Sequence, residues 1–244
     1  MLESRSSSQS SNNRSLVIDS KANSILGALP QAEFDRIRPK FDPVALRYGK
    51  SVYLPDQEID HVYFVTEGVV SLLAALETGA TVEAGVIGPE GIVGFPVVLG
   101  AKTTPHQALV QGAGSALRMS AKELNAEFKR GGMLHDLILQ YTNQLFIQVA
   151  QTAACNRVHN VEERLARWLL LTHDRTQGDQ FTLTQEFIAR MLGVRRAGVS
   201  VAASGLRKEK LIDYRRGVVT ILNRKGLEGA SCECYRTAKN QSEQ

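Results

Sequence analysis

One glycine between two short amphipathic segments constrains this chain more than any other feature of its sequence. Gly193 stands where a helix end requires a residue that tolerates a positive φ. The segment before it has one apolar face, made by Phe187, Ile188, Met191 and Leu192. The segment after it repeats small and apolar residues at helical spacing, namely Val199, Ala202, Ala203 and Leu206. The sequence therefore predicts two short helices around a tight turn over 184–209, with the Thr184 hydroxyl capping the first.

The second predicted helix has the chemistry of a DNA-recognition helix. Arg195 and Arg196 at its start reach guanine edges or phosphates, and small outward side chains let such a helix sit deep in the major groove. An ordinary helical hairpin with a basic exposed face is the alternative. The residues predicted to contact DNA are Thr184, Arg195, Arg196, Ala197, Ser200, Val201, Ser204, Arg207, Arg215 and Arg216.

The next segment favours DNA binding further. Residues 211–222 alternate in the manner of a β-hairpin, with a turn at Arg215-Arg216-Gly217. A hairpin directly after a recognition helix makes a winged helix-turn-helix, and its tip would place Arg215 and Arg216 near the phosphate backbone.

Charge is unevenly distributed along the 244 residues, of which 43% are hydrophobic. Residues 157–244 hold 16 lysines and arginines against 10 acidic residues, a net charge of +6, whereas residues 1–156 carry −2. A basic C-terminal third beside a neutral remainder fits a nucleic-acid-binding module joined to another domain, although a solvated basic surface has the same composition.

The remainder of the chain changes from helix to strand and back. Residues 1–19 are polar and Ser-rich, which predicts a disordered tail, and 20–40 have helical spacing. Residues 42–120 hold short apolar runs between turn residues such as Glu67-Gly68 and Gly88-Pro89-Glu90-Gly91, which indicates an antiparallel β-sandwich or barrel. A short helix begins after Ser120.

A long helix without Gly or Pro is expected over 133–157. Its apolar stripe is either a core face or a seam between two chains, and for a helix that joins two domains we favour the seam. The predicted homodimer interface is Leu134, Ile138, Tyr141, Leu145, Gln148 and Thr152.

This order of parts resembles the Crp/Fnr family of transcription regulators. Tyr48-Gly49-Lys50, the run from Val62 to Gly68 and Gly88-Pro89-Glu90-Gly91 look like turn signatures of the family's β-roll. The run from Arg164 to Leu170 looks like the first helix of its DNA-binding domain, and 184–212 is the strongest match. The resemblance covers about residues 20–225 and implies a homodimer on near-palindromic promoter DNA, in contact with RNA polymerase.

The resemblance also implies an effector pocket, from which this chain departs. Cyclic-AMP-binding members hold the ribose with a Gly-Glu-Leu turn and the phosphate with an Arg-Ser pair, and here the matching positions are Gly94-Phe95-Pro96 and His106-Gln107. The lost charge-assisted bonds are worth about 1.5–3 kcal/mol each. We therefore predict no tight binding of cyclic AMP and no cofactor, and the effector is unknown; an apolar or aromatic ligand near Phe95 stays open.

The recognition helix also departs from the family. Ala197 and Val201 replace an acidic residue and an arginine of the best-studied members, so the DNA sequence that is read should differ.

The predicted architecture is α+β. It comprises a tail (1–19), a cyclic-nucleotide-binding-like sensor (20–132) built as a cupin-like antiparallel β-roll, a dimerisation helix (133–157), a winged helix-turn-helix domain (158–227) and a C-terminal tail (228–244).

Other chemistries have weaker signals. Cys155, Cys232 and Cys234 are too few for a disulfide framework, and Cys155 is interpreted as a small core residue. Cys232-Glu233-Cys234 could bind a metal or form a redox pair, but the tail around it holds few other ligands and the five histidines show no metal-ligand spacing, so no metal is predicted. The glycines at 85, 88, 91 and 94 are interpreted as turns and not as a phosphate loop. We expect a cytoplasmic protein without membrane contact and no catalytic residues. A stand-alone ligand-binding protein and an enzyme with a β-roll regulatory domain are the alternative classes.

Overall fold

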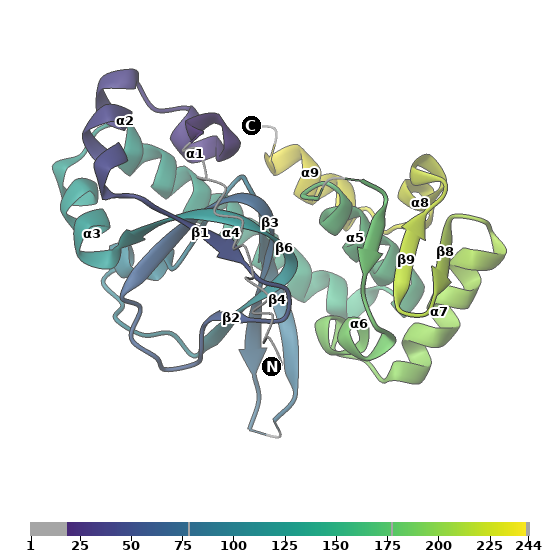
Figure 1. The fold of residues 1–244 in the computed structure, drawn as a ribbon. Coiled ribbons are helices and arrows are strands. Elements are labelled where there is room, and N and C mark those ends of the chain that lie inside the picture. Colours follow the sequence, from purple (N-terminus) through teal and green to yellow (C-terminus); the bar gives the residue numbers. More distant parts are fainter. Residues whose placement is uncertain (1–18, 78, 177, 243–244) are drawn as a thin grey trace, which may run out of the picture.

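The computed structural model describes residues 19–77, 79–176 and 178–242. An antiparallel β-roll with its covering helices forms one side of the molecule and the helices α5–α9 form the other, with the long helix α4 between them (Figure 1). This arrangement confirms the predicted α+β class. Residues 1–18, which make up nearly all of the predicted tail, lie outside the described residues.

The N-terminal segment is broken into short helices, whereas the sequence predicted helix across 20–40. Pro30 begins α2 at its N-cap position with φ −55°, and the chain before it ends α1 at Gly27, so no helix continues through Leu29 and Pro30. The apolar residues that carry the helical spacing in this segment are all buried, namely Ile25, Leu26, Leu29, Phe34 and Ile37. The elements are η1 (Ser20–Ala22), α1 (Ser24–Gly27), α2 (Gln31–Ile37) and η2 (Arg38–Lys40).

The β-roll is a single antiparallel sheet with the strand order β1-β6-β3-β4, to which β2 and β5 add on β6 and β3. Alternating apolar side chains of β3 and β6 close its core. Its elements are β1 (Asp42–Leu46), β2 (Ser51–Tyr53), β3 (His61–Ala75), β4 (Thr81–Ile87), β5 (Ile92–Val93), η3 (Phe95–Leu99) and β6 (His106–Ser120).

The expected turn at Glu67-Gly68 is wrong, because β3 continues through it. Gly68 has φ +91°, and the pairing register of β3 with β6 shifts around Glu67. Opposite it, a Cβ at Gly114 would collide with the Glu67 carbonyl oxygen. These glycines therefore mark a bulge where two backbones touch, which bends one long strand and does not end it.

Two helices follow the β-roll: α3 (Ala121–Arg130), whose N-cap Ser120 accepts from the Glu123 amide, and α4 (Met133–Val158). Gly131 and Gly132 separate them, both with positive φ. The α4 stripe predicted as a dimer seam faces its own chain instead. Leu134, Ile138, Tyr141, Leu145 and Thr152 are buried in this single chain.

The physical reason is that the β-roll needs α4 as part of its core. The apolar core of the β-roll includes Leu134, Ile138, Tyr141 and Leu145. The Gln148 side chain accepts a hydrogen bond from the Val86 amide of β4 at 2.8 Å. Thr152 accepts from Arg167 of the next helix at 2.8 Å. A seam between two chains along α4 would therefore use the opposite face of the helix.

The C-terminal part is a three-stranded sheet, β7-β9-β8, surrounded by helices. The predicted tail after residue 227 is folded, because α9 packs against α4 and the buried Tyr235 hydroxyl accepts from Arg224 at 2.7 Å. The elements are α5 (Val161–His173), β7 (Gln180–Thr182), α6 (Gln185–Leu192), α7 (Arg196–Lys208), β8 (Ile212–Arg215), β9 (Val218–Ile221), α8 (Arg224–Ala230) and α9 (Cys234–Ser242).

The two parts of the molecule are docked through buried polar contacts. Trp168 of α5 donates its indole N–H to Glu83 of β4 at 2.8 Å. The Gln111 amide of β6 donates to the Thr172 hydroxyl of α5 at 2.8 Å. Because unpaired polar groups are costly to bury, each part of the molecule needs the other to satisfy these atoms.

Burial raises the pKa of Glu83 from 4.5 to about 7, against the opposing effect of hydrogen bonds from Ser71 and Trp168 and of the Arg167 and Arg175 charges. Its Oε2 atom is buried with no hydrogen-bond partner among the described residues. Because the folded carboxyl holds its proton more tightly than the unfolded one, its contribution to stability is complete below pH 4.5 and is lost as the pH rises through about 7.

We predict that Glu83→Gln removes this pH dependence. The wild-type free energy of unfolding in urea should fall by on the order of 2–3 kcal/mol more than that of the variant between about pH 5 and about pH 8. The exposed Glu58→Gln is the matched control and should follow the wild type. Parallel pH profiles for wild type and Glu83→Gln would contradict the role given to this carboxyl.

Candidate nucleic-acid interface

The two-helix unit forms as the sequence predicts. The Thr184 hydroxyl caps α6 by accepting from the Phe187 amide at 3.1 Å. Gly193 ends this helix in the left-handed region, with φ +62°. A Cβ at Gly193 would lie 2.5 Å from Val82 of β4, so the turn is pressed against the β-roll. Both the conformation and the close approach require glycine here.

The second helix, α7, buries the face that was predicted to pack inward, and its opposite face is open to solvent. Val201 is 73% exposed, which is unusual for a valine in a helix, and Ala197 and Ser204 lie beside it on the same face. Ser200 is half-buried, and Arg207 is exposed one turn further on. The centre of the outward face therefore carries only small side chains.

Arginines lie at both ends of this face. Arg195 is the N-cap residue of α7 and Arg196 its first residue, and both are exposed. The amides at the start of α7 add the positive end of the helix dipole. The N-terminal end of α7 therefore attracts anions.

The wing is a tight hairpin of β8 and β9. Its two loop residues, Arg216 and Gly217, have φ of +50° and +78°, as a primed two-residue turn requires. The Tyr214 hydroxyl donates to the Leu183 carbonyl at 2.7 Å, which ties the wing to the start of α6. Burial raises the pKa of Tyr214 to about 12, although the Arg196 charge lowers it, so the hydroxyl keeps its proton.

Asp213 was missed by the sequence analysis, although it bonds to two of the predicted DNA-contacting arginines. Its carboxylate lies 3.4 Å from Arg207 Nε and 3.0 Å from Arg215 Nε. It therefore links the end of the recognition helix to the wing. The alternation of Ile212, Asp213 and Tyr214 in a hairpin places Asp213 beside α7. This alternation was the signal in the sequence from which Asp213 could have been identified.

Two open grooves flank α7. One, of about 420 Å³, is lined by Thr184 and Glu186 at the start of α6, by Arg196, and by Tyr214 and Arg216 of the wing. The other, of about 530 Å³, is lined by residues that α7, the following turn and β8 contribute, among them Ser204, Arg207, Lys208, Lys210 and Arg215. The exposed face of α7 thus lies between one groove that contains two arginines and a glutamate and a second groove that is more basic.

The effector-pocket candidates lie on two different elements. Gly94 precedes η3 with φ +89°, and Phe95, followed by Pro96, sets its ring edge-on to Tyr141 at 6.1 Å. His106 and Gln107 begin β6, where the His106 ring bonds to Thr104 at 3.0 Å and the Gln107 amide donates to Ser51 at 2.7 Å.

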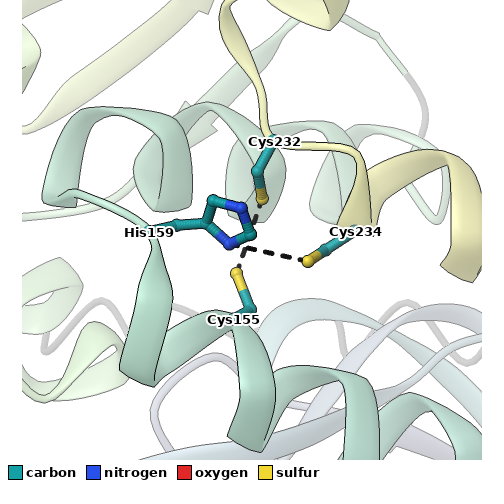
Figure 2. Close-up of side chains that lie close together, drawn as sticks. All are labelled: Cys155, His159, Cys232 and Cys234. Atoms are coloured by element: carbon teal, nitrogen blue, oxygen red, sulfur yellow. Dashed lines mark hydrogen bonds between the residues drawn. The ribbon is translucent and has the colours of Figure 1, made fainter.

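A second cluster was not predicted. Cys155 and His159 at the end of α4 meet Cys232 and Cys234 from the segment before and at the start of α9 (Figure 2). The signal in the sequence was the pair of spacings Cys155-x3-His159, one helical turn, and Cys232-x-Cys234. Each pair alone lacks two ligands, and no local pattern indicates that the fold brings the two pairs together.

Two family models match the chain. A cyclic nucleotide-binding domain matches residues 43–130, and a Crp-like helix-turn-helix domain matches residues 163–230. The two matches follow one another in the order observed in the fold, with α4 between them. The chain belongs to the Crp/Fnr family. Its Crp-like domain contains α6, α7 and the wing.

Solved structures of Crp/Fnr regulators share this fold. FixK2 from Bradyrhizobium japonicum is 17% identical, with a TM-score of 0.67, and the match covers 79% of this chain and 98% of that one. A CRP/FNR-family transcriptional regulator from Thermus thermophilus is 20% identical, with a TM-score of 0.64 and coverage of 78% and 98%. The c-di-GMP-responsive global regulator CLP from Xanthomonas campestris is 17% identical, with a TM-score of 0.63 and coverage of 79% and 99%.

A comparison of the sequence with curated proteins finds no match. Among the described residues, no helix is both long and apolar enough to cross a membrane.

Proposed function

We propose that this Crp/Fnr protein is a homodimeric transcription factor that binds near-palindromic promoter DNA. The observation that carries the proposal is the exposed face of α7 between two grooves that both contain arginines. A helix with this face enters the major groove, and the grooves receive the phosphates on either side.

The residues have distinct roles in this proposal. Arg195 and Arg196 reach base edges or the nearest phosphates, while Ala197, Val201 and Ser204 allow close approach to the bases. Thr184, Ser200 and Arg207 contact the edges of the site. Arg215 and Arg216 of the wing contact the backbone and carry no sequence information.

The proposed dimer seam is the solvent face of α4. Phe146 is 71% exposed and Leu139, seven residues earlier, is 42% exposed, and the exposed Ala150 and Ala153 continue the same stripe toward the end of the helix. A spacing of seven residues keeps side chains on one seam of paired helices. An exposed apolar stripe on a helix of 26 residues supports pairing with a second copy of this chain.

In such a dimer each α7 would enter one of two successive major grooves, about 34–36 Å apart. The β-roll would bias the orientation of the DNA-binding domains between two states. Contact with RNA polymerase is part of the proposal because the protein belongs to this family. An enzymatic role has no support in this arrangement.

Cyclic AMP is not the proposed effector. Phe95 offers no acceptor for a ribose hydroxyl, and the polar atoms of His106 and Gln107 already bond to Thr104 and Ser51. An apolar or aromatic ligand beside Phe95 and Tyr141 is the alternative.

We expect Arg196→Ala to weaken binding to DNA selected from the source genome by about 10-fold or more, and to reduce discrimination between sites.

Arg216→Ala should weaken binding to all sequences and lower the slope of log K against log salt by about one. Gel-shift titrations at several salt concentrations measure both. Arg130→Ala, an exposed arginine at the end of α3, is the control. Binding without sequence preference that Arg196→Ala leaves unchanged would support a stand-alone ligand-binding protein instead.

We expect Phe146→Asp to convert the protein into a monomer, because a charge in the centre of the seam is left unpaired. Analytical ultracentrifugation measures the mass, and Leu54→Asp, an exposed leucine outside α4, controls for the added charge. A wild-type monomer, or a dimer that Phe146→Asp does not weaken, would reject this seam.

Calorimetry with cyclic AMP should give no binding heat up to millimolar nucleotide, because the charged partners for the phosphate are missing. Micromolar binding that His106→Ala abolishes would contradict the proposed pocket chemistry.

A further inference from the structure

Four side chains with metal-binding atoms converge where the two parts of the molecule meet. Cys155 and His159 lie one turn apart at the end of α4, and Cys232 and Cys234 flank Glu233 just before α9. Figure 2 shows all four side chains pointing toward one another. Their ligand atoms all lie within 4.8 Å of one another, although 77 residues of chain separate Cys155 from Cys232.

The distances fit the edges of a small tetrahedron. Cys155 Sγ lies 3.5 Å from Cys232 Sγ, and Cys234 Sγ lies 3.7 Å from His159 Nδ1. Zinc bonds of about 2.3 Å to sulfur and about 2.0 Å to nitrogen set ligand atoms about 3.5–3.8 Å apart in tetrahedral geometry. The cluster therefore needs little movement to enclose an ion of this size.

The surrounding contacts are those of an ordered ligand shell. The three cysteines are 0%, 6% and 1% exposed, in chain order. His159 Nε2 lies 3.2 Å from the Glu233 carboxylate, which leaves Nδ1 facing the sulfurs. Carboxylate partners fix ligating histidines in this way. The Gln151 amide donates to Cys234 Sγ at 3.0 Å, as donors to metal-bound thiolates do.

Two buried arginines of α5 also favour a negative charge at the cluster. Arg164 and Arg167 are both buried, and the charge of each acts on Cys155. Their Nε–H groups have no hydrogen-bond partner in the described part of the chain. Buried guanidinium groups are costly without a nearby negative charge. Three thiolates around a dication carry a net charge of −1, which neutral thiols would not supply.

We propose that Cys155, His159, Cys232 and Cys234 bind a structural zinc ion that joins the end of α4 to the C-terminal segment. A closed set of three sulfurs and one imidazole nitrogen is typical of structural zinc. The site lies at His159, beside the junction where α4 ends and Asn160 caps α5. Zinc would therefore hold α9, the junction and the start of α5 in one arrangement.

The first experiment measures metal in the full-length protein, purified without chelator on a tag that contains no histidine. Mass spectrometry of the metal content should give about one zinc per chain. Cys232→Ser and His159→Asn should lose at least nine-tenths of it, whereas His135→Asn, on the same helix but outside the cluster, should retain it. Cobalt(II) in place of zinc should show tetrahedral ligand-field bands and thiolate charge-transfer absorption.

A second variant covers the case in which the cysteine variants fail to fold. Glu233 is exposed, so Glu233→Gln should fold while weakening the zinc affinity by about 10–100-fold, as measured by competition with a chelating dye. An unchanged zinc affinity in Glu233→Gln would contradict the role of Glu233 as the carboxylate that orients His159 toward the metal.

Three results would overturn the proposal. The first is protein without bound metal that also fails to take up added zinc or cobalt. The second is iron with acid-labile sulfide, which would identify an iron–sulfur cluster. The third is a Cys155–Cys232 disulfide in metal-free protein, seen by mass spectrometry after alkylation without reduction, because oxidised sulfurs cannot ligate zinc.

Discussion

The packing of α4 against its own β-roll determines most of the remaining structure. The Tyr141 ring packs directly on Gly91, because a Cβ on this glycine would lie 2.5 Å from the ring. Gln148 accepts a hydrogen bond from the backbone of β4. Because these contacts fix the rotation of the helix about its axis, they also fix which side chains face solvent. Phe146 on the opposite face is exposed in its own chain, and the last turns of α4 present Cys155 and Thr152 to the C-terminal part.

The helix-turn-helix was predictable because its determinants are local. A hydroxyl at Thr184, a glycine at 193 and the apolar spacing on both sides specify two helices and their turn without information from elsewhere in the chain. The hairpin after α7 was predictable for the same reason, since Arg216-Gly217 is a turn sequence between two alternating segments. The strands of the β-roll were recognised as strands, but the bulge at Gly68 was interpreted as a turn, because only the opposing strand reveals it.

What the sequence did not reveal depends on contacts between distant segments. The apolar stripe of α4 satisfies the spacing of a core face and of a seam equally well, and only the position of the β-roll decides between them. The cysteine–histidine cluster depends on α9 folding back onto α4, which the polar composition after residue 227 did not predict. The raised pKa of Glu83 likewise arises from a domain contact that no single segment encodes.

In the proposed DNA complex, Asp213 has a consequence for how two arginines bind phosphates. Its carboxylate already occupies Arg207 and Arg215, so a phosphate that approaches either arginine competes with an anion that is part of the protein. The electrostatic gain from any phosphate contact is reduced by the loss of that internal pair. In the proposed complex this cost applies to every DNA sequence, so phosphate contacts alone hold the protein less tightly and base contacts through α7 supply a larger share of the binding free energy. An acidic residue in this basic surface would thus make DNA binding depend more strongly on the base contacts of α7.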